Sequence, residues 1–310
     1  MRALVVRRFG GLDAAEIASW PAPVPGPGEV LVRVRAASVN PIDAKLRSGA
    51  MRGFLKLEPP YVSGRDFCGT IDALGEGMRD LPLATLVVGV ADLARGSHAD
   101  LVAVPRAAVA PVPAGLDPVG AASLGVAGLS AYIPLVEMAD VRAGQRVLVL
   151  GGAGGVGTLA IQIAAARGAT VWVTTRPPRE RLVRDLGAAG IVDHTTDAVE
   201  KRAPDFDVMF DTVGGELQRR AQHALKAGGQ VVELTAAPVD PARQRKDITY
   251  RRAAVRADGG RLDKLMALVA AGTLKPVIGA VHALEDWQAA FRALEAGAVP
   301  GKIVLDLGAG

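Results

Sequence analysis

The stretch VLVLGGAGGVGTLAIQIAAARGA, residues Val147–Ala169, decides the fold of this chain. A short apolar run, predicted as a strand over Arg146–Leu150, leads into a G-x-G-x-x-G pattern, and a helix predicted over Val156–Arg167 follows at once. A strand and a helix on either side of such a loop are the context of a dinucleotide-binding turn. Positions without side chains permit a sharp turn and let the backbone approach a pyrophosphate at the positive end of the helix. The alternative is a turn that needs glycine only for its shape. We predict cofactor contacts at Gly152, Gly154, Gly155, Val156 and Gly157.

The end of the next strand, predicted over Thr170–Thr174, indicates which cofactor is bound. A site for NAD usually has an acidic residue there, about 20 residues past the loop, that bonds the ribose 2′-hydroxyl. This chain reads VTTRPPRERLVR and has no acid before Glu180. Guanidinium groups suit a phosphate dianion, so NADPH is favoured over NADH. The alternative is a solvated helix face on which the arginines pair with Glu180 and Asp185. The residues expected to contact NADPH here are Thr174, Thr175, Arg176 and Arg179.

The chain divides into two parts that differ in their pattern of predicted strands and helices. Up to about Gly120, short β-like runs are broken by proline and glycine, which indicates a barrel-like, β-rich half. Beyond it, strands and helices alternate, which predicts a parallel, doubly wound sheet and an α/β fold class. The strands expected after the glycine loop are Thr170–Thr174, Ile191–Asp193, Phe206–Phe210, Val231–Thr235 and Tyr250–Arg256, with helices over Glu180–Leu186 and Glu216–Leu225. A helix from Arg261, a strand over Val277–Val281, a helix over Glu285–Ala296 and a strand over Lys302–Leu307 are expected to close the chain.

Composition indicates a globular chain with a sizeable core. Of 310 residues, 50% are hydrophobic and 22% are charged, which is close to the globular average, so disorder is not expected. A net charge of +4 is too small to argue by itself for a nucleic-acid partner. The single cysteine, Cys68, excludes an internal disulfide and a multi-cysteine zinc site, and it fits a reducing compartment. We expect Cys68 to be a small buried hydrophobe and not a nucleophile.

Neither a targeting segment nor a membrane span is expected. The N-terminal sequence MRALVVRRFGG lacks the apolar core of a secretory signal. Two uncharged stretches, Pro118–Val136 and Val147–Ala166, are about long enough to cross a bilayer. Their prolines and glycines instead indicate turns between buried elements. The expected location is the cytoplasm, with no membrane partner.

Seven segments in the same order resemble the medium-chain dehydrogenase/reductase superfamily, specifically its zinc-free, quinone oxidoreductase-like branch. The resemblance covers essentially the whole chain. It implies a GroES-like catalytic domain built from residues 1–120 and 258–310, a Rossmann domain from residues 121–257, and a homodimer. The segments are ASVNPIDAKLRSG (Ala37–Gly49), PYVSGRDFCGTI (Pro60–Ile71), GLSAY (Gly128–Tyr132), AGQRVLVLGGAGGVG (Ala143–Gly157), FDVMFDTVGG (Phe206–Gly215), LKAGGQVV (Leu225–Val232) and GKIVL (Gly301–Leu305).

The resemblance also indicates which residues are replaced. Asn40 stands where zinc-dependent relatives have a cysteine ligand, and Arg65 stands where they have a histidine. Because neither side chain suits zinc, no metal site is expected. Arg65 is instead expected to pair with a neighbouring carboxylate. Residues that lie beside the cofactor in relatives, and are therefore candidate cofactor contacts, are Asp211, Val213 and Lys302.

Four residues are candidates for the catalytic pocket. Asn40 would donate a hydrogen bond to a substrate oxygen or to the nicotinamide ribose, and Asp43 would orient its own loop. Lys45 stands where the best-known quinone reductases of the family have a tyrosine, and it would steer a carbonyl or relay a proton. Ser130 would bond the nicotinamide end. The alternative for Asp43 and Asp66 is local turn and N-cap bonding.

These features point to a reductase that acts without zinc. Zinc enzymes stabilise an alkoxide-like charge with a Lewis acid that contributes several kcal/mol, and this chain lacks the corresponding ligands. We expect NADPH to give hydride to an acceptor that is already reactive, namely a quinone or a carbonyl conjugated to a C=C bond. The protein would supply orientation and a polar pocket for the oxygen that gains charge.

Two alternatives stay open. The first is a non-catalytic NADPH-binding protein, either a redox sensor or an RNA-binding protein. The basic residues are interleaved with Asp and Gly and lack aromatic neighbours, so no nucleic-acid partner is expected. The second is an enoyl thioester reductase, since one basic stretch would suit an anionic substrate arm. Its members are Arg243, Arg245, Lys246, Arg251, Arg252 and Arg256.

Overall fold

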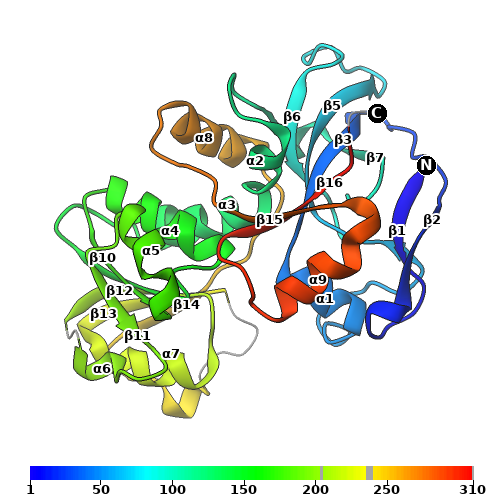
Figure 1. Cartoon of the computed structure of the whole chain (residues 1–310). Helices are drawn as coiled ribbons and strands as arrows, with labels where there is room; N and C mark the ends of the chain where they lie inside the picture. The colour runs from blue at the N-terminus through cyan, green and yellow to red at the C-terminus, as the bar shows by residue number, and fades with distance from the viewer. Residues whose placement is uncertain (203–204, 235–239, 309–310) are drawn as a thin grey trace. The chain divides into compact units, whose positions relative to one another are not determined.

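Two compact units make up the chain (Figure 1). This computed structural model describes residues 1–202, 205–234 and 240–308. The first unit consists of Met1–Val126, Arg256–Ala270 and Pro276–Gly310, and the second of Ala127–Val255 and Ala271–Lys275. The predicted α/β class is confirmed, because a β-rich unit accompanies one with a parallel sheet. That the domains divide at residues 120 and 257 stays a prediction; the compact units divide at 126 and 255.

Two sheets form the framework of the first unit. The strands are β1 (Arg2–Val6), β2 (Ala15–Ser19), β3 (Glu29–Val39), β4 (Tyr61–Val62), β5 (Asp66–Leu74), β6 (Leu86–Val90), β7 (Leu101–Pro105), β8 (Val109–Pro111), β15 (Ile278–Ala283) and β16 (Lys302–Asp306). The helices are α1 (Pro41–Ser48), α2 (Pro118–Ala122), α8 (Gly259–Ala270) and α9 (Trp287–Glu295). One sheet has the order β15-β16-β3-β5-β6-β8, with β7 paired to β3, and the smaller sheet has the order β2-β1-β4. Only the β15–β16 pairing among these ladders is parallel within the described residues.

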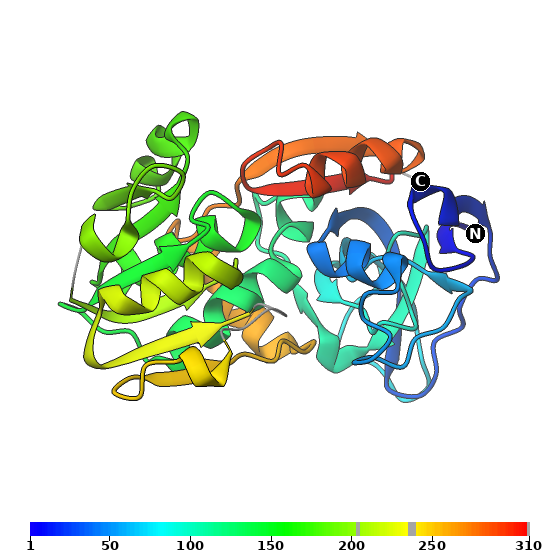
Figure 2. The same cartoon turned by 90° about the horizontal axis from the view of Figure 1, so that it is seen from below.

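The neighbours of β3 bring distant parts of the sequence together. On one side Val304 of β16 pairs with Ser38, and on the other side Cys68 of β5 pairs with Ala36. The last strand runs beside β15 in the orange and red part of Figure 2. The start of β16, the end of β3 and the start of β5 are therefore side by side, and this is where the polar cluster described below is built.

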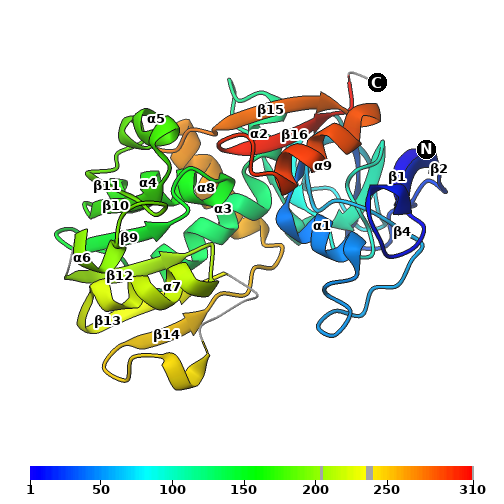
Figure 3. The same ribbon diagram turned by 60° about the horizontal axis from the view of Figure 1, so that its bottom comes forward.

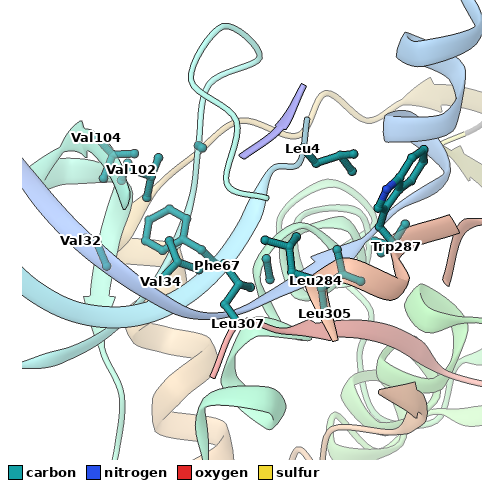
Figure 4. Close-up of a cluster of buried hydrophobic side chains, with 14 of the residues drawn as sticks. Leu4, Val32, Val34, Phe67, Val102, Val104, Leu284, Trp287, Leu305 and Leu307 are labelled. Atoms are coloured by element: carbon teal, nitrogen blue, oxygen red, sulfur yellow. The ribbon is translucent and has the colours of Figure 1, made fainter. Parts of the chain in front are cut away.

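The core of the first unit is made of aliphatic side chains around a few aromatic rings. Figure 4 shows Phe67 between the valines of β3 and β7, and Trp287 near Leu284 and Leu4. Phe67 is fully buried, and burial of a side chain of this size stabilises by about 1.5–3 kcal/mol. Its ring requires a glycine on β6, because a Cβ on Gly89 would lie 2.3 Å from the Phe67 Cζ.

The second unit is a six-stranded parallel sheet of order β11-β10-β9-β12-β13-β14. Its strands are β9 (Arg146–Leu150), β10 (Thr170–Thr175), β11 (Gly190–Asp193), β12 (Phe206–Asp211), β13 (Leu225–Glu233) and β14 (Thr249–Arg252). Its helices are α4 (Gly155–Ala166), α5 (Glu180–Asp185), α6 (Val199–Arg202) and α7 (Gly215–Ala221), and α3 (Gly125–Tyr132) leads into the unit. Numbered along the chain, the strands stand in the order 3-2-1-4-5-6 of doubly wound dinucleotide-binding sheets. Figure 3 shows the strands of this sheet with the helices that connect them.

Three predicted elements of this unit, α7, β13 and β14, differ from the sequence-based prediction by more than one residue. The helix predicted over Glu216–Leu225 ends at Ala221, and a short 3-10 turn (Gln222–Ala224) leads directly into β13 at Leu225. The start of β13 was not predicted, because the glycines of LKAGGQ are not typical of a strand. The ladder of β13 with β12 is irregular between Phe206 and Val208. The strand predicted over Tyr250–Arg256 ends at Arg252, because its neighbour β13 ends at Glu233. The predicted end of the preceding strand, Thr235, lies outside the described residues.

No helix in the described part of the chain is both long enough and apolar enough to cross a membrane. The apolar stretch from Val147 is divided between β9, the glycine turn and α4.

Candidate active site

The predicted glycine turn lies between β9 and α4. Gly151 opens it with a φ of 82°, a conformation that glycine adopts without steric cost. The amide of Gly151 donates to Thr174 Oγ1 and the amide of Gly152 donates to the Thr174 carbonyl oxygen, both at 3.0 Å. The turn is thus fastened to β10, and Gly154 follows as the N-cap of α4.

Two of the glycines are required by packing, while a third leaves open space. A Cβ on Gly152 would lie 2.6 Å from the Val173 Cβ, and a Cβ on Gly157 would lie 2.1 Å from the Gly151 carbonyl oxygen. Gly154 is exposed, and its Cβ would have 3.4 Å to that same oxygen. The first amides of a helix have no acceptor inside the helix and lie at its positive end. An open backbone surface at this end is what a dinucleotide diphosphate requires, so the residues present fit the cofactor.

The end of β10 divides the four predicted contacts into two kinds. Thr174 and Thr175 are buried, and the Thr174 hydroxyl is engaged by the glycine turn. Arg179 is half-buried at the end of a 3-10 turn (Pro177–Arg179). Arg176 is exposed at the N-cap of that turn, and its side chain has no hydrogen-bond or ion-pair partner in the described part of the chain.

The carboxylates that were the alternative partners of these arginines are paired elsewhere. Glu180 accepts from Arg184 at 2.7 Å, and Asp185 lies 3.8 Å from Arg181. Neither ion pair involves Arg176, so its guanidinium is available to an anion. This arrangement agrees with the interpretation of Arg176 as a phosphate contact.

The turn after β12 lies beside the glycine turn. Asp211 is fully buried, and its Oδ1 accepts from the amides of Val213 (2.9 Å) and Gly214 (3.0 Å). Burial raises the pKa of Asp211, while the two amides oppose this shift. Val213 is 49% exposed, and its Cγ2 would be 3.0 Å from a Cβ on Gly151. Asp211 therefore shapes the turn, and Val213 is the member of the predicted pair that faces outward.

In the first unit, Asn40 and Lys302 form one buried polar cluster with Asp66. Lys302 Nζ donates to Asn40 Oδ1 at 2.6 Å and to the Val39 carbonyl oxygen at 3.2 Å. Asn40 Nδ2 donates to Asp66 Oδ2 at 3.0 Å, and Lys302 Nζ lies 3.6 Å from the same oxygen. All three side chains are at least nine-tenths buried. Burial lowers the pKa of Lys302, and the charges of Asp66 and Asp43 oppose this shift.

Asp43 stands at the start of α1 and holds that helix end in place. Its Oδ2 accepts from the main-chain N–H of Asn40 at 2.7 Å, which agrees with the expectation that Asp43 orients its own loop. Its Oδ1 is buried and has no hydrogen-bond partner within the described residues. Burial raises the pKa of Asp43 to about 7, mostly because an ionised carboxylate is costly away from water. The group can therefore hold or release a proton near neutral pH.

The two other catalytic candidates are not in this cluster. Lys45 lies on the exposed side of α1, whereas Asp43 and Leu46 are on its buried side. Ser130 is buried on α3, in the part of that helix that belongs to the second unit. No hydrogen bond joins either side chain to Asn40 or Lys302 among the described residues.

Other residues near the cluster have structural roles. His98 is fully buried, its Nε2 lies 3.2 Å from the Ser38 carbonyl oxygen, and burial lowers its pKa to about 4. Arg65 Nε donates to the Ala91 carbonyl oxygen at 3.2 Å, so its hydrogen bond goes to a carbonyl and not to the carboxylate we expected. Cys68 is fully buried and burial raises the pKa of its thiol, as expected for an unreactive cysteine.

No group of three or more His, Cys, Asp or Glu side chains in the described residues is arranged to hold a metal ion. The side-chain amide of Asn40 accepts a hydrogen bond from Lys302 and donates one to Asp66.

Asp66 is the functional candidate that sequence reasoning missed. Local turn bonding was the alternative for it in the sequence, yet its contacts come from Ser38, Asn40, Val126 and Lys302, none of which is its neighbour in sequence. The signal available was its place directly after Arg65, inside a segment that resembles the family. The sequence alone could not show that Asp66, and not Arg65, meets the side chains of Ser38, Asn40 and Lys302 and the main-chain amide of Val126.

A sheet of this order with a glycine turn after its first strand defines a dinucleotide-binding protein. Two family models match the chain: an alcohol dehydrogenase GroES-like domain over residues 26–114 and a zinc-binding dehydrogenase over residues 186–305. The chain belongs to the medium-chain dehydrogenase/reductase superfamily, as a quinone oxidoreductase-like member. The resemblance to the quinone oxidoreductase-like branch and the GroES-like and Rossmann folds that it implied are thereby confirmed, while the lack of zinc and the homodimer stay predictions.

Three relatives illustrate this similarity. The chain is 33% identical to the mitochondrial NAD(P)H oxidoreductase RTN4IP1 of Danio rerio, over 91% of this chain and 84% of that protein. It is also 33% identical to the chloroplastic NADPH-dependent alkenal/one oxidoreductase of Arabidopsis thaliana, over 98% and 79% of the two chains. The solved structure of the quinone oxidoreductase from Coxiella burnetii is similar with a TM-score of 0.90 and 28% identity, over 99% of each chain.

Proposed function

We propose that this protein is an oxidoreductase that uses NADPH to reduce a quinone or an α,β-unsaturated carbonyl compound. The observation that carries the proposal is the glycine turn before α4, which is open at Gly154 and adjoins a strand that ends beside Arg176, whose side chain has no partner among the described residues. The absence of an acid at the end of β10 favours NADPH over NADH. The acceptor class is supported by two similar proteins named an alkenal/one oxidoreductase and a quinone oxidoreductase.

Different residues of the chain are proposed to bind the cofactor and to assist the reduction of the acceptor. When bound, NADPH supplies the hydride. The N-terminus of α4 would hold the diphosphate, and Arg176 and Arg179 would hold the 2′-phosphate. Lys302 was predicted from the sequence as a cofactor contact; in this proposal its ammonium, in the first unit, would instead stabilise negative charge on the acceptor oxygen, and Asp43 would hold a proton near neutral pH. Lys45 and Ser130 stay candidates for orienting the acceptor and the nicotinamide end.

The proposal includes a reaction without zinc. Its support is that Asn40 and Arg65 stand where zinc ligands are found in zinc-dependent relatives, and both are engaged in hydrogen bonds with their neighbours. We expect elemental analysis of the pure protein to find no stoichiometric zinc, and EDTA to leave turnover unchanged. Loss of activity on chelation, restored by zinc, would contradict this part.

The proposal also includes a homodimer in the cytoplasm. The edge strand β14 pairs only with β13 in the described residues, so its outer edge has unpaired backbone groups. A second copy of the chain would satisfy them. Light scattering is expected to give twice the mass of one chain, and a monomer at micromolar concentration would contradict it.

A substrate panel with NADPH and NADH in parallel tests the main proposal. We expect the absorbance of NADPH to fall when a small quinone or an enone is added, and NADH to be used less well. Flat traces across a broad panel of both acceptor classes would contradict the activity, and a preference for NADH would contradict the role of Arg176.

The structure makes the basic stretch a weaker basis for an enoyl thioester substrate. Arg245 is paired with Asp247, Arg252 is paired with Glu233, and Arg251 donates to the Met138 carbonyl oxygen. At least three of the six basic side chains are therefore engaged with described residues of the protein. An enoyl thioester belongs in the panel as a third acceptor class.

A further inference from the structure

The carboxylate of Asp66 is the centre of the buried polar cluster. It is fully buried at the first residue of β5. Its Oδ1 accepts from the Val126 amide at 2.5 Å, in the first turn of α3. Its Oδ2 accepts from Asn40 Nδ2 and from the Ser38 hydroxyl, and it lies 3.6 Å from Lys302 Nζ. Four donors from three parts of the chain, at residues 38–40, at Val126 and at Lys302, are thus directed at one side chain.

The chain leaves no room for another side chain at this contact. A Cβ on Gly125 would lie 2.6 Å from Asp66 Oδ1, so the start of α3 approaches the carboxylate as closely as a backbone without a side chain allows. Replacement of a buried ion pair by apolar residues is often neutral or stabilising, so such a pair is weak evidence for a role in stability. A role in the site accounts better for three buried polar side chains in one place.

Asp66 gives the Asn40 amide a single orientation. A carboxylate only accepts hydrogen bonds and an ammonium only donates them. Between Asp66 and Lys302, the amide must therefore turn its NH2 group to Asp66 and its oxygen to Lys302, as the distances of 3.0 and 2.6 Å indicate. The second amide proton faces the Ser38 carbonyl oxygen at 3.4 Å. Both side-chain amide protons of Asn40 are engaged. The most weakly held donor is therefore the Lys302 proton that faces Asp66 Oδ2, because the two heavy atoms are 3.6 Å apart.

We propose that Asp66 is a positioning residue for the reduction, which holds the Asn40 amide and the Lys302 ammonium in one fixed arrangement through its buried carboxylate. This inference rests on the proposed function, because it assigns to Lys302 the contact with the acceptor oxygen. The charged groups that face Lys302 are Asp66 on β5 and Asp43 on α1, with the neutral His98 nearby. Loss of the Asp66 charge removes one of two carboxylates that keep the ammonium protonated.

The substitution Asp66→Asn tests the proposal, with Asp72→Asn as its matched control. Asp72 lies on the same strand, and its ion pair with Arg33 at 2.9 Å is partly exposed. We expect D66N to lower kcat by about 10–100-fold, because a displaced group loses its near-attack geometry, with a smaller change in the KM of the acceptor. The basic limb of the kcat–pH profile should move to lower pH by about 1–3 units, since loss of an opposite charge lowers the pKa of an ammonium by that amount. D72N should leave both unchanged.

A second measurement does not depend on turnover. The side-chain 15N signal of Lys302, assigned with Lys302→Arg, is titrated by NMR in the wild type, D66N and D72N. We expect its midpoint to fall by about 1–3 units in D66N alone. An unchanged midpoint and pH profile, with only a lower melting temperature, would make Asp66 merely structural and overturn the proposal.

Two further variants keep the proposal testable. Ser38→Ala removes a hydrogen bond to Asp66 but leaves its charge, so it should shift neither the Lys302 midpoint nor the pH profile; a shift as large as in D66N would overturn the proposal. If D66N does not fold, Asp66→Glu decides. It keeps the charge but displaces the carboxylate, so kcat should fall while the Lys302 midpoint is kept, and wild-type kcat would overturn the proposal. A wild type that reduces neither acceptor class contradicts the proposed function, whereas the NMR titration still decides the link between Asp66 and Lys302.

Discussion

A pair of glycine substitutions separates the two tasks of the turn between β9 and α4. In Gly157→Ala, the new Cβ would lie 2.1 Å from the Gly151 carbonyl oxygen and 2.8 Å from the Gly152 Cα. Both are backbone atoms, which a rotamer change cannot move. Overpacking of this kind costs about 1–3 kcal/mol, partly offset by about 1 kcal/mol from the better helix propensity of alanine. At roughly 2–4 °C per kcal/mol, we expect the melting temperature to fall by several degrees.

Gly154→Ala is the contrasting change. Its Cβ would have 3.4 Å to the Gly151 carbonyl oxygen, and its φ of −78° suits any residue. Stability should change by less than about 1 kcal/mol, the usual effect of alanine at an N-cap. The methyl group would occupy the open surface assigned to the diphosphate, and loss of a charged hydrogen bond costs about 1.5–3 kcal/mol. The Kd of NADPH should therefore rise by about 10–100-fold.

Two assays on the same samples decide this prediction. Differential scanning fluorimetry without nucleotide gives the melting temperatures, and calorimetric titration gives the Kd of NADPH. Wild-type stability of G157A would refute the argument from close packing. Wild-type affinity of G154A would mean that the diphosphate does not approach the backbone at this position.

Three other substitutions or treatments have definite expected outcomes. Arg176→Ala should weaken NADPH by about 10-fold and leave NADH unchanged in calorimetry, since it removes a charge-assisted contact, whereas Arg184→Ala, whose partner is Glu180, should change neither. Burial raises the pKa of Asp43 from 3.8 to about 7. The contribution of Asp43 to stability is therefore fully present below pH 3.8 and is lost as the pH rises through about 7. Asp43→Asn should flatten that decline in urea unfolding, by at most about 4 kcal/mol at ~1.4 kcal/mol per pKa unit, and an unaltered pH dependence would contradict it. Cys68 should react with a thiol reagent only after unfolding, and rapid labelling of the native protein would contradict its burial.

Much of the nucleotide-binding unit could be predicted from local sequence. Arg146–Leu150 was predicted with the bounds of β9, and α4 differs from its prediction by one residue at each end. These elements are strongly patterned, because a buried parallel strand is apolar throughout and the glycines mark the turn. The start of β13 could not be found in this way. Its first residues, LKAGGQ, carry no apolar pattern, and they belong to the strand because Leu225 and Gln230 pair with Phe206 and Val208 of β12.

The candidate site could be predicted residue by residue but not as an arrangement. The sequence predicts that Asn40 donates to a substrate oxygen or to the nicotinamide ribose and that Lys302 contacts the cofactor, but it does not predict the hydrogen bond between their side chains. The role of Thr174 as an acceptor for the Gly151 amide also depends on the path of the backbone and not on its residue type. Such contacts follow from strand order and register, which a single sequence does not specify.

The register between β3 and β16 explains how a lysine can be kept buried at this place. An isolated ammonium away from water would lose its proton, so its position has to come with acceptors already in place. Ile303 pairs with Val39. Lys302, which precedes Ile303, can therefore donate both to the Val39 carbonyl oxygen and to Oδ1 of the Asn40 side chain. Asp66 then arrives from the other side of β3 with the opposite charge. A shift of β16 by one residue would turn Lys302 to the other face of the sheet, so the ladder that completes the fold also determines which side chain meets Asp66.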